Sequence, residues 1–218
     1  MKGILITFEG IEGCGKTTQM TRLEAFLKAK GRATLTTLEP GEGPIGRRIR
    51  EDLLTHHPEP LDPLAELMLY LADRAQHVTR VVTPALQEGT IVLCDRYTDS
   101  TVAYQGYGRG IDLEKIRDLN AFVTRGLTPD LTFLLDCPPE VGLDCPPEVG
   151  LKRIRGALDR MESQGLSFHR RVREGYLALA KASPDRIVLC DATLPVDEVF
   201  EKITTALYDR GILEDDRD

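Results

Sequence analysis

The residues with the clearest chemical potential lie near the amino terminus, where positions 10–17 read GIEGCGKT. This segment fits the pattern G-x-x-x-x-G-K-[ST], in which glycines let backbone amides turn inward around phosphate groups. The apolar run Ile4–Phe8 precedes it, and the helix-like run Thr18–Lys30 follows it and adds partial positive charge at its amino end. The segment predicts a P-loop that holds a nucleoside triphosphate; the alternative is a glycine-rich turn with an incidental lysine.

Two side chains of this loop have distinct expected roles. Lys16 is expected to reach the β- and γ-phosphates, and the Thr17 hydroxyl is expected to ligate Mg²⁺. A second apolar run ends in Asp95, which is a further candidate to hold the ion, directly or through water. The residues expected to bind ATP in and beside the loop are Gly10, Ile11, Glu12, Gly13, Cys14, Gly15, Lys16, Thr17 and Thr18.

Short apolar runs recur along the chain and must form the elements that position this loop. They are rich in Ile, Val and Leu without polar alternation, as expected of parallel strands buried on both faces. Helix-like stretches separate them, including 64–86 and 113–123, so we expect an α/β fold with about five parallel strands flanked by helices. No linker divides the 218 residues, which predicts a single domain. The expected strands are 4–8, 33–38, 90–94, 131–135 and 186–190.

Composition and charge narrow the class of protein. A net charge of −7 argues against a general nucleic-acid surface. No stretch approaches the ~20 apolar residues of a membrane span, and the amino terminus lacks the features of a signal peptide. The five cysteines are odd in number and contain no CxxC pair, which favours a reducing, cytoplasmic setting.

Longer motifs give the sequence a specific resemblance. It lacks the Asn-Lys-x-Asp motif of GTPases, and it is similar to bacterial thymidylate kinases over essentially its whole length. The motifs that carry the match are FEGIEGCGKTTQ, the Glu39-Pro40-Gly41 turn, LMLYLADRAQH, DRYTDSTVAYQGYGRG, LDRMES and FHRRVREGYLALA. The resemblance implies Mg²⁺-dependent transfer of the γ-phosphate of ATP to dTMP, giving dTDP, by a P-loop kinase with a short helical lid, roughly 147–167, that forms a homodimer.

The resemblance also implies an acceptor site. Arg74 is expected to donate to a thymine carbonyl, and Tyr70, one helical turn earlier, to stack on the ring, although core packing would also explain Tyr70. Ser100 and Gln105 complete recognition of the base, and Tyr104 crowds the sugar C2′. The residues expected to bind dTMP are Glu12, Glu39, Pro40, Arg50, Tyr70, Arg74, Arg96, Ser100, Thr101, Tyr104 and Gln105.

Several charged residues are expected to take part in catalysis. Arg96 is expected to clamp the dTMP phosphate, and Glu12 to point toward the sugar 3′-hydroxyl. Glu9 is a candidate metal ligand, with a buried structural acid as the equal alternative. The expected catalytic residues are Lys16, Asp95, Arg96 and Arg153.

Phosphoryl transfer requires positive groups that neutralise the negative charge of the transferred phosphate. The P-loop residues Gly13 and Cys14 have no charged side chain that could do so. The segment 152–160 supplies Arg153, Arg155 and Arg160 instead, as in the lid-arginine type of the family. Arg153 is the first choice for catalysis, and Arg155 is expected to contact ATP. The alternative is that this Lys/Arg-rich helix is a solvated face.

Two features depart from the family pattern. Leu38 precedes Glu39 where relatives carry arginine, and Glu42 adds a negative charge; Arg47 or Arg50 is expected to compensate. The octapeptide LDCPPEVG also occurs twice in succession, at 135–142 and 143–150. Only one copy can continue the strand, so the surplus residues are expected to loop out at low cost; the alternative is altered movement of the lid.

Two other functions stay open from the residues alone. One is a kinase for another nucleotide or nucleoside, or a ligase of the same fold, which leaves ADRAQH and AYQG unexplained. The other is a nucleotide-gated binding module, for which the loss of arginine at position 38 is the only support.

Overall fold

A parallel sheet of five strands forms the centre of the protein, in the spatial order β2-β3-β1-β4-β5. We describe the chain from a computed structural model, which covers residues 3–140 and 159–214. The predicted α/β class is thereby confirmed. The strands are β1 Ile4–Glu9, β2 Thr34–Leu38, β3 Ile91–Asp95, β4 Leu131–Asp136 and β5 Ile187–Asp191.

Four of these strands end one residue later than the apolar runs predict, and each extra residue is acidic. They are Glu9, Asp95, Asp136 and Asp191. The backbone of such a residue still pairs in the ladder, as Phe8 with Asp95 does, while its side chain reaches the edge of the sheet. Because all the strands are parallel, their carboxyl ends gather carboxylates at one edge, which is where ligands bind in open α/β sheets.

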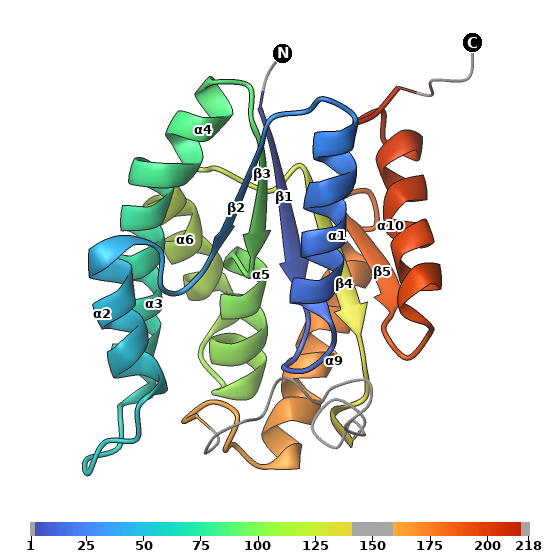
Figure 1. Cartoon of the computed structure of the whole chain (residues 1–218). Helices are drawn as coiled ribbons and strands as arrows, with labels where there is room; N and C mark the ends of the chain where they lie inside the picture. The colour runs from blue at the N-terminus through green and yellow to red at the C-terminus, as the bar shows by residue number, and fades with distance from the viewer. Residues whose placement is uncertain (1–2, 141–158, 215–218) are drawn as a thin grey trace.

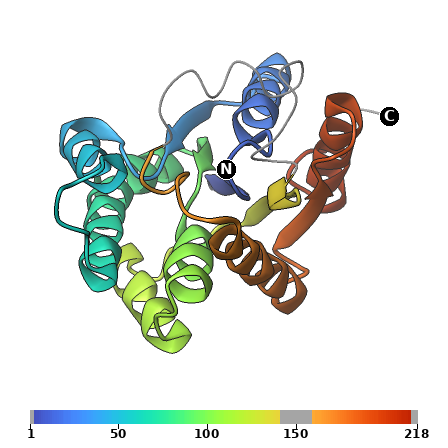
Figure 2. The same ribbon diagram turned by 90° about the horizontal axis from the view of Figure 1, so that it is seen from below.

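Helices cover both faces of the sheet. In Figure 2, α1 and α10 lie on one side of the strands, and α9 with α5 lies on the other. Farther along, α2 and α3 extend beyond the β2 edge, with α6 packed behind α3 (Figure 1). The bounds are α1 Lys16–Ala29, α2 Gly43–Leu54, α3 Pro63–His77, α4 Thr83–Gln87, α5 Thr98–Thr101, α6 Leu113–Thr124, α9 Leu166–Ala182 and α10 Val196–Asp209.

Two π-helical segments interrupt these helices. The predicted continuous helix 64–86 is divided into α3, η1 (Val78–Val82) and α4. The segment η2, Val102–Gly108, continues α5 and packs closely on α9. Such segments are rare and often lie at functional sites; η2 carries the AYQG residues of the expected acceptor site.

The main apolar core lies between the sheet and its helices. Phe8 of β1 and Phe133 of β4 are fully buried, with ring centroids 5.4 Å apart. Leu23 of α1 and Val172 of α9 close this core from opposite faces. No helix within the described residues is long and apolar enough to cross a membrane.

The first copy of the repeated octapeptide supplies the end of β4. Leu135 is buried and pairs with Cys190 of β5, and Asp136 accepts two hydrogen bonds from Arg173 at 2.7 and 2.8 Å. The second copy, 143–150, lies outside the described residues, as does most of the predicted lid. The structure resumes at Asp159 and enters α9 at Leu166.

Candidate active site

The glycine-rich loop connects the end of β1 to α1. Gly10 has a φ of 136°, and a Cβ atom there would lie 2.4 Å from the carbonyl oxygen of Leu135. Gly15 has a φ of 92° immediately before α1, which carries no side-chain cap at its amino terminus. Uncapped backbone amides at a helix amino terminus form an anion site. The loop therefore has the backbone of a phosphate cradle.

Lys16 lies inside this loop and is 7% exposed. Its ammonium donates to the carbonyl oxygens of Gly10 at 3.0 Å and Ile11 at 2.8 Å. Thr17, on the next position, is exposed. The lysine is thus held at the centre of the cradle, where a bound anion would meet its charge.

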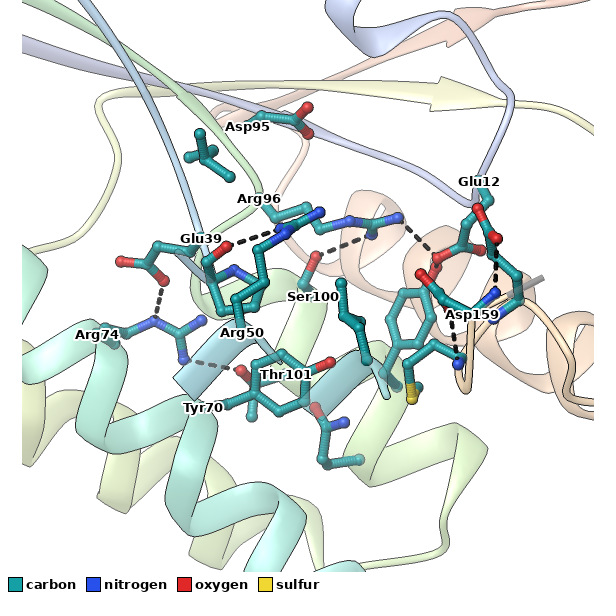
Figure 3. Close-up of a pocket in the computed structure, with 17 residues that line it drawn as sticks. Glu12, Glu39, Arg50, Tyr70, Arg74, Asp95, Arg96, Ser100, Thr101 and Asp159 are labelled. Carbon is teal, nitrogen blue, oxygen red and sulfur yellow. Dashed lines mark hydrogen bonds and ion pairs between the residues drawn. The ribbon is translucent and has the colours of Figure 1, made fainter. Parts of the chain in front are cut away.

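A cavity of about 180 Å³ opens beside the loop, at the carboxyl edge of β1, β2 and β3. All eleven residues expected to bind dTMP line it, although they come from five separate segments of the chain. Figure 3 shows Tyr70, Arg74 and Thr101 at one end, and Arg96 and Glu12 at the other. The remaining lining residues are Leu38, Leu54, Asp95, Asp159, Met161 and Glu162.

Arg74 organises the first end of this cavity and is 2% exposed. Its Nε donates to Glu39 at 2.8 Å and its Nη1 to Thr101 at 2.7 Å (Figure 3). Its Nη1 also donates to Asn120 at 2.7 Å, and its Nη2 donates to the Tyr97 carbonyl at 2.9 Å. An arginine has five N–H groups. These four bonds leave one N–H on Nη2 for a ligand.

The carboxylate of Glu39 is fully engaged in supporting that arginine. Its other oxygen lies 2.7 Å from Nδ1 of His77, whose Nε2 meets the Thr37 hydroxyl at 2.8 Å. Both Glu39 and His77 are buried. Glu39 therefore lines the cavity while its charge is committed to Arg74 and His77.

Arg96 organises the second end. Its guanidinium donates to Glu12 at 3.0 Å, Ser100 at 3.3 Å and Tyr176 at 3.2 Å, and lies 5.0 Å from the centroid of the Tyr104 ring. Its backbone is left-handed, with a φ of 68°. This conformation is uncommon for arginine and is found where the surroundings dictate a side-chain direction.

Glu12 faces the cavity rather than the interior of the P-loop. Its Oε1 accepts from Tyr104 at 2.7 Å as well as from Arg96. Burial opposes its ionisation, but Arg96, Lys16 and the Tyr104 hydroxyl together hold its pKa below the ordinary value. Glu12 therefore remains a negative acceptor beside the guanidinium.

Glu9 lies behind the cavity wall and is completely buried. It accepts from the Tyr97 backbone at 2.7 Å, from Ser100 at 2.6 Å and from Tyr176 at 2.9 Å. Burial, followed by the negative charge of Asp99, raises the pKa of Glu9 to about 7. Its contacts make Glu9 the anchor of Ser100.

Asp95 is the acid best placed to meet a cation. It lines the cavity at the end of β3, and its buried Oδ1 has no hydrogen-bond partner among the described residues. The described part of the chain contains no group of three or more His, Cys, Asp or Glu that could hold a metal by itself. Mg²⁺ usually takes one or two carboxylates and completes its shell with waters and substrate phosphates, so this donor set fits it.

The loop that departs from the family pattern has a clear geometry. Leu38 lines the cavity, whereas Glu42 turns away, capping α2 through the Gly43 amide at 3.0 Å and accepting from Thr37 at 3.1 Å. Arg50 lines the cavity and donates to the Pro40 carbonyl at 2.7 Å (Figure 3), whereas Arg47 is exposed and does not line the cavity. Of the two arginines expected to compensate for Leu38, Arg50 is therefore the one that lines the cavity.

Sequence reasoning missed part of the cavity wall. Asp159, Met161 and Glu162 line it from the turn before α9. The Asp159 side chain accepts from the amides of Met161 and Glu162 at 2.8 Å each, which folds this turn. The LDRMES motif was the available signal, because an aspartate can bond the backbone two and three residues ahead.

Of the three arginines expected in the lid, one lies within the described residues. Arg153 and Arg155 lie outside the described residues. Arg160 is described and donates to the Leu53 carbonyl at 2.7 Å and to the buried Glu66 carboxylate at 2.6 Å. Arg160 thus joins the turn before α9 to α2 and α3.

Comparisons with known proteins agree with this geometry. The profile of the family described as thymidylate kinase matches residues 8–203. The chain is 51% identical to the thymidylate kinase of Deinococcus radiodurans, over 96% of this chain and 98% of that protein, and 50% identical to that of Trichlorobacter lovleyi, over 95% and 98%. The crystal structure of thymidylate kinase from Ehrlichia chaffeensis superposes with a TM-score of 0.74 at 32% identity, covering 95% of this chain and 99% of that one.

The contacts of Arg74 predict that it stabilises the fold as well as the site. We expect Arg74→Ala to lower the free energy of unfolding by about 3–5 kcal/mol, because it leaves the Glu39 carboxylate buried without its partner. Urea unfolding measures this loss, with the exposed Arg80→Ala as a matched control expected to change it by less than about 0.5 kcal/mol. Equal small losses in both variants would show that the ion pair is not structural.

The pKa of Glu9 predicts a pH dependence of stability. An unfolded glutamate loses its proton near pH 4.5, but folded Glu9 keeps it to about pH 7, so this residue costs stability as the pH rises through that window. Glu9→Gln should therefore gain free energy of unfolding relative to wild type between pH 4.5 and 7, by up to roughly 3 kcal/mol. Unfolding curves across pH test this, with the exposed Glu88→Gln as control; a constant difference would refute the raised pKa.

Proposed function

Because the chain belongs to the thymidylate kinase family, we propose that its cavity is the dTMP site of an enzyme that transfers the γ-phosphate of ATP to dTMP. The product is dTDP, a precursor of dTTP. The observation that carries the assignment of the site is the convergence of Tyr70, Arg74, Gln105 and Arg96 on one cavity beside the P-loop. ATP takes the loop and dTMP takes the cavity.

The base occupies the end of the cavity formed by α3 and η2. Tyr70 presents its ring there and is only half-buried. The remaining N–H of Arg74 donates to a carbonyl of thymine, while Thr101 and Ser100 hold the arginine and the wall in place. A site whose buried donors need a partner rejects substrates that leave those donors unpaired.

The 5′-phosphate lies at the opposite end, between Arg96 and Arg50. Both side chains line the cavity, and guanidinium groups bind phosphate through paired N–H groups. Glu12 and Tyr104 hold Arg96 in position, and we assign Glu12, which lines the cavity, to accept from the sugar 3′-hydroxyl. With Glu42 directed away, no added negative charge opposes the phosphate.

The triphosphate lies along the P-loop backbone and the amino terminus of α1. The Lys16 ammonium, held within the loop, neutralises the β- and γ-phosphates and stabilises the charge that spreads over the transferred group. We assign Mg²⁺ to the Thr17 hydroxyl and Asp95; when bound, it neutralises phosphate charge. Glu9, with its oxygens taken by three donors, supports this site by fixing Ser100.

The lid is assigned the remaining positive charge that the transferred phosphate needs. From the sequence we assign Arg153 as the arginine that stabilises the transferred phosphate, with Arg155 on ATP, because Gly13 and Cys14 contribute no charge. Arg160 has a different role, since its guanidinium is committed to Glu66 and the Leu53 carbonyl.

We also propose that the enzyme is a cytoplasmic homodimer. Large apolar side chains stand exposed on α3 and α6, which pack side by side: Leu64 is 57%, Met68 48% and Phe122 81% exposed. Exposed apolar side chains on two adjoining helices support an interface there.

The preference of the enzyme among phosphate acceptors tests this function directly. In an ADP-release assay with ATP and Mg²⁺, we expect the highest kcat/KM for dTMP among dTMP, dUMP, dCMP, AMP and thymidine. Lys16→Ala serves as the control for contaminating kinases and should lose turnover with every acceptor. A better acceptor than dTMP would favour another nucleotide kinase, and ATP binding without turnover would favour a nucleotide-gated module.

Arg153 and Arg160 provide a matched pair of variants for the lid. Arg153→Ala should lower kcat by at least about 10³, as loss of an arginine finger does, without changing the free energy of unfolding. Arg160→Ala should lower that free energy by about 1–3 kcal/mol, because it removes a donor from a buried carboxylate. A larger loss of kcat in Arg160→Ala than in Arg153→Ala would reverse the assignment.

A further inference from the structure

Glu66 is a completely buried carboxylate on α3, one turn before Tyr70 and two before Arg74. Its Oε1 accepts from Nε2 of Gln105 at 2.9 Å and from Nε of Arg109 at 3.1 Å. Its Oε2 accepts from Nη2 of Arg109 at 2.9 Å and from Nη1 of Arg160 at 2.6 Å. Four donors thus surround a carboxylate that lies beneath the base end of the cavity.

These contacts keep Glu66 ionised. Burial favours the neutral acid, but the hydrogen bonds from Arg109, Gln105 and Arg160 outweigh it and hold the pKa of Glu66 below its ordinary value. An ionised carboxylate only accepts hydrogen bonds. The Gln105 amide must therefore turn its NH₂ group toward Glu66.

The position of the Gln105 carbonyl oxygen follows from this orientation of the NH₂ group. Gln105 is 1% exposed and lines the cavity, and its carbonyl oxygen has no hydrogen-bond partner within the described ranges 3–140 and 159–214. Because the NH₂ group is bound to Glu66, the carbonyl oxygen is the amide atom that remains for a ligand in the cavity. The base consequently meets an acceptor at this position.

Pyrimidine bases differ in the hydrogen-bond donors and acceptors that they present to Gln105 and Arg74 at this end of the cavity. Thymine and uracil carry an N–H donor at N3 beside the O4 carbonyl, whereas cytosine has an N3 acceptor beside an amino group. An acceptor from Gln105 and a donor from Arg74 match the first pair and oppose the second. The orientation of one amide therefore separates thymine from cytosine.

We propose that Glu66 is a positioning residue that fixes the polarity of the Gln105 amide and thereby excludes cytosine nucleotides from the acceptor site. The proposal rests on the assignment of the cavity as the dTMP site. Glu66 touches no substrate in this role. It acts through Gln105, and Arg109 and Arg160 keep it charged.

The variant Glu66→Gln makes a directional test possible. Its amide oxygen can accept from Nη2 of Arg109 and Nη1 of Arg160 at the Oε2 position, which are the two shorter arginine contacts. Its NH₂ then takes the Oε1 position, facing Gln105 and displacing the longer contact from Nε of Arg109. Gln105 then turns its carbonyl inward and presents NH₂ to the base. We expect kcat/KM to fall for dTMP and to rise for dCMP, so that the dTMP/dCMP ratio drops by roughly 10- to 100-fold, as expected for one reversed hydrogen bond.

A double-mutant cycle with Gln105→Met shows whether the effect passes through Gln105. The shift in the ratio caused by Glu66→Gln should disappear in the Gln105→Met background, while the KM for ATP stays unchanged in all variants. The exposed Glu114→Gln on α6 is the matched control and should leave the ratio unchanged. An unchanged ratio in Glu66→Gln, or a shift that persists without Gln105, overturns the proposal.

A second variant keeps the proposal testable if Glu66→Gln does not fold. Glu66→Asp keeps a negative charge between the two arginines but withdraws it by one methylene from Gln105, so the ratio should again fall; an unchanged ratio overturns the proposal. Wild-type kinetics separate the two levels of inference. If wild type does not prefer dTMP, the proposed function fails, whereas a dTMP-specific wild type with an unaltered Glu66→Gln ratio refutes the role of Glu66 alone.

Discussion

The ion pair between Arg74 and Glu39 lies at a point where several elements of the chain meet. Glu39 follows β2, Arg74 lies on α3, and the remaining N–H groups of the arginine reach Thr101 of α5, Asn120 of α6 and the Tyr97 carbonyl after β3. Both charges are 2% exposed. A buried charge is tolerated only when it is paired and hydrogen-bonded, so all these elements must be in place together.

The same constraint extends to the opposite end of the cavity. Arg96 meets Glu12 of the P-loop, and Glu9 of β1 meets Ser100 and Tyr176. Because β1 lies between β3 and β4, Glu9 at its end and Glu12 in the P-loop that follows it connect the phosphate loop to the acceptor wall. The donor and acceptor sites are therefore built around one strand, and neither can shift without disturbing buried charge.

The sequence predicted the fold well because its signals are local. Five apolar runs and the glycine pattern placed the strands within a residue and the loop at the right edge of the sheet. The dTMP-binding set came from resemblance to a family, and all eleven residues line one cavity; their individual roles stay predictions. The supporting residues were not predictable, since nothing local pairs Glu66 with Gln105, 39 positions away, or Arg160, 94 positions away.

The buried carboxylates share one physical consequence. Glu9, Glu12, Glu39 and Glu66 each accept from a side chain that lines the cavity, respectively Ser100, Arg96, Arg74 and Gln105. An ionised carboxylate only accepts, so Glu12, Glu39 and Glu66 decide which hydrogen of each partner is bound inside the protein and which group remains for a ligand. Orientation is then settled when the chain folds rather than when the substrate arrives, so binding need not supply the free energy of reorganising these dipoles. The burial of the Glu39 and Glu66 carboxylates in a protein of net charge −7 is therefore a cost of folding that serves recognition.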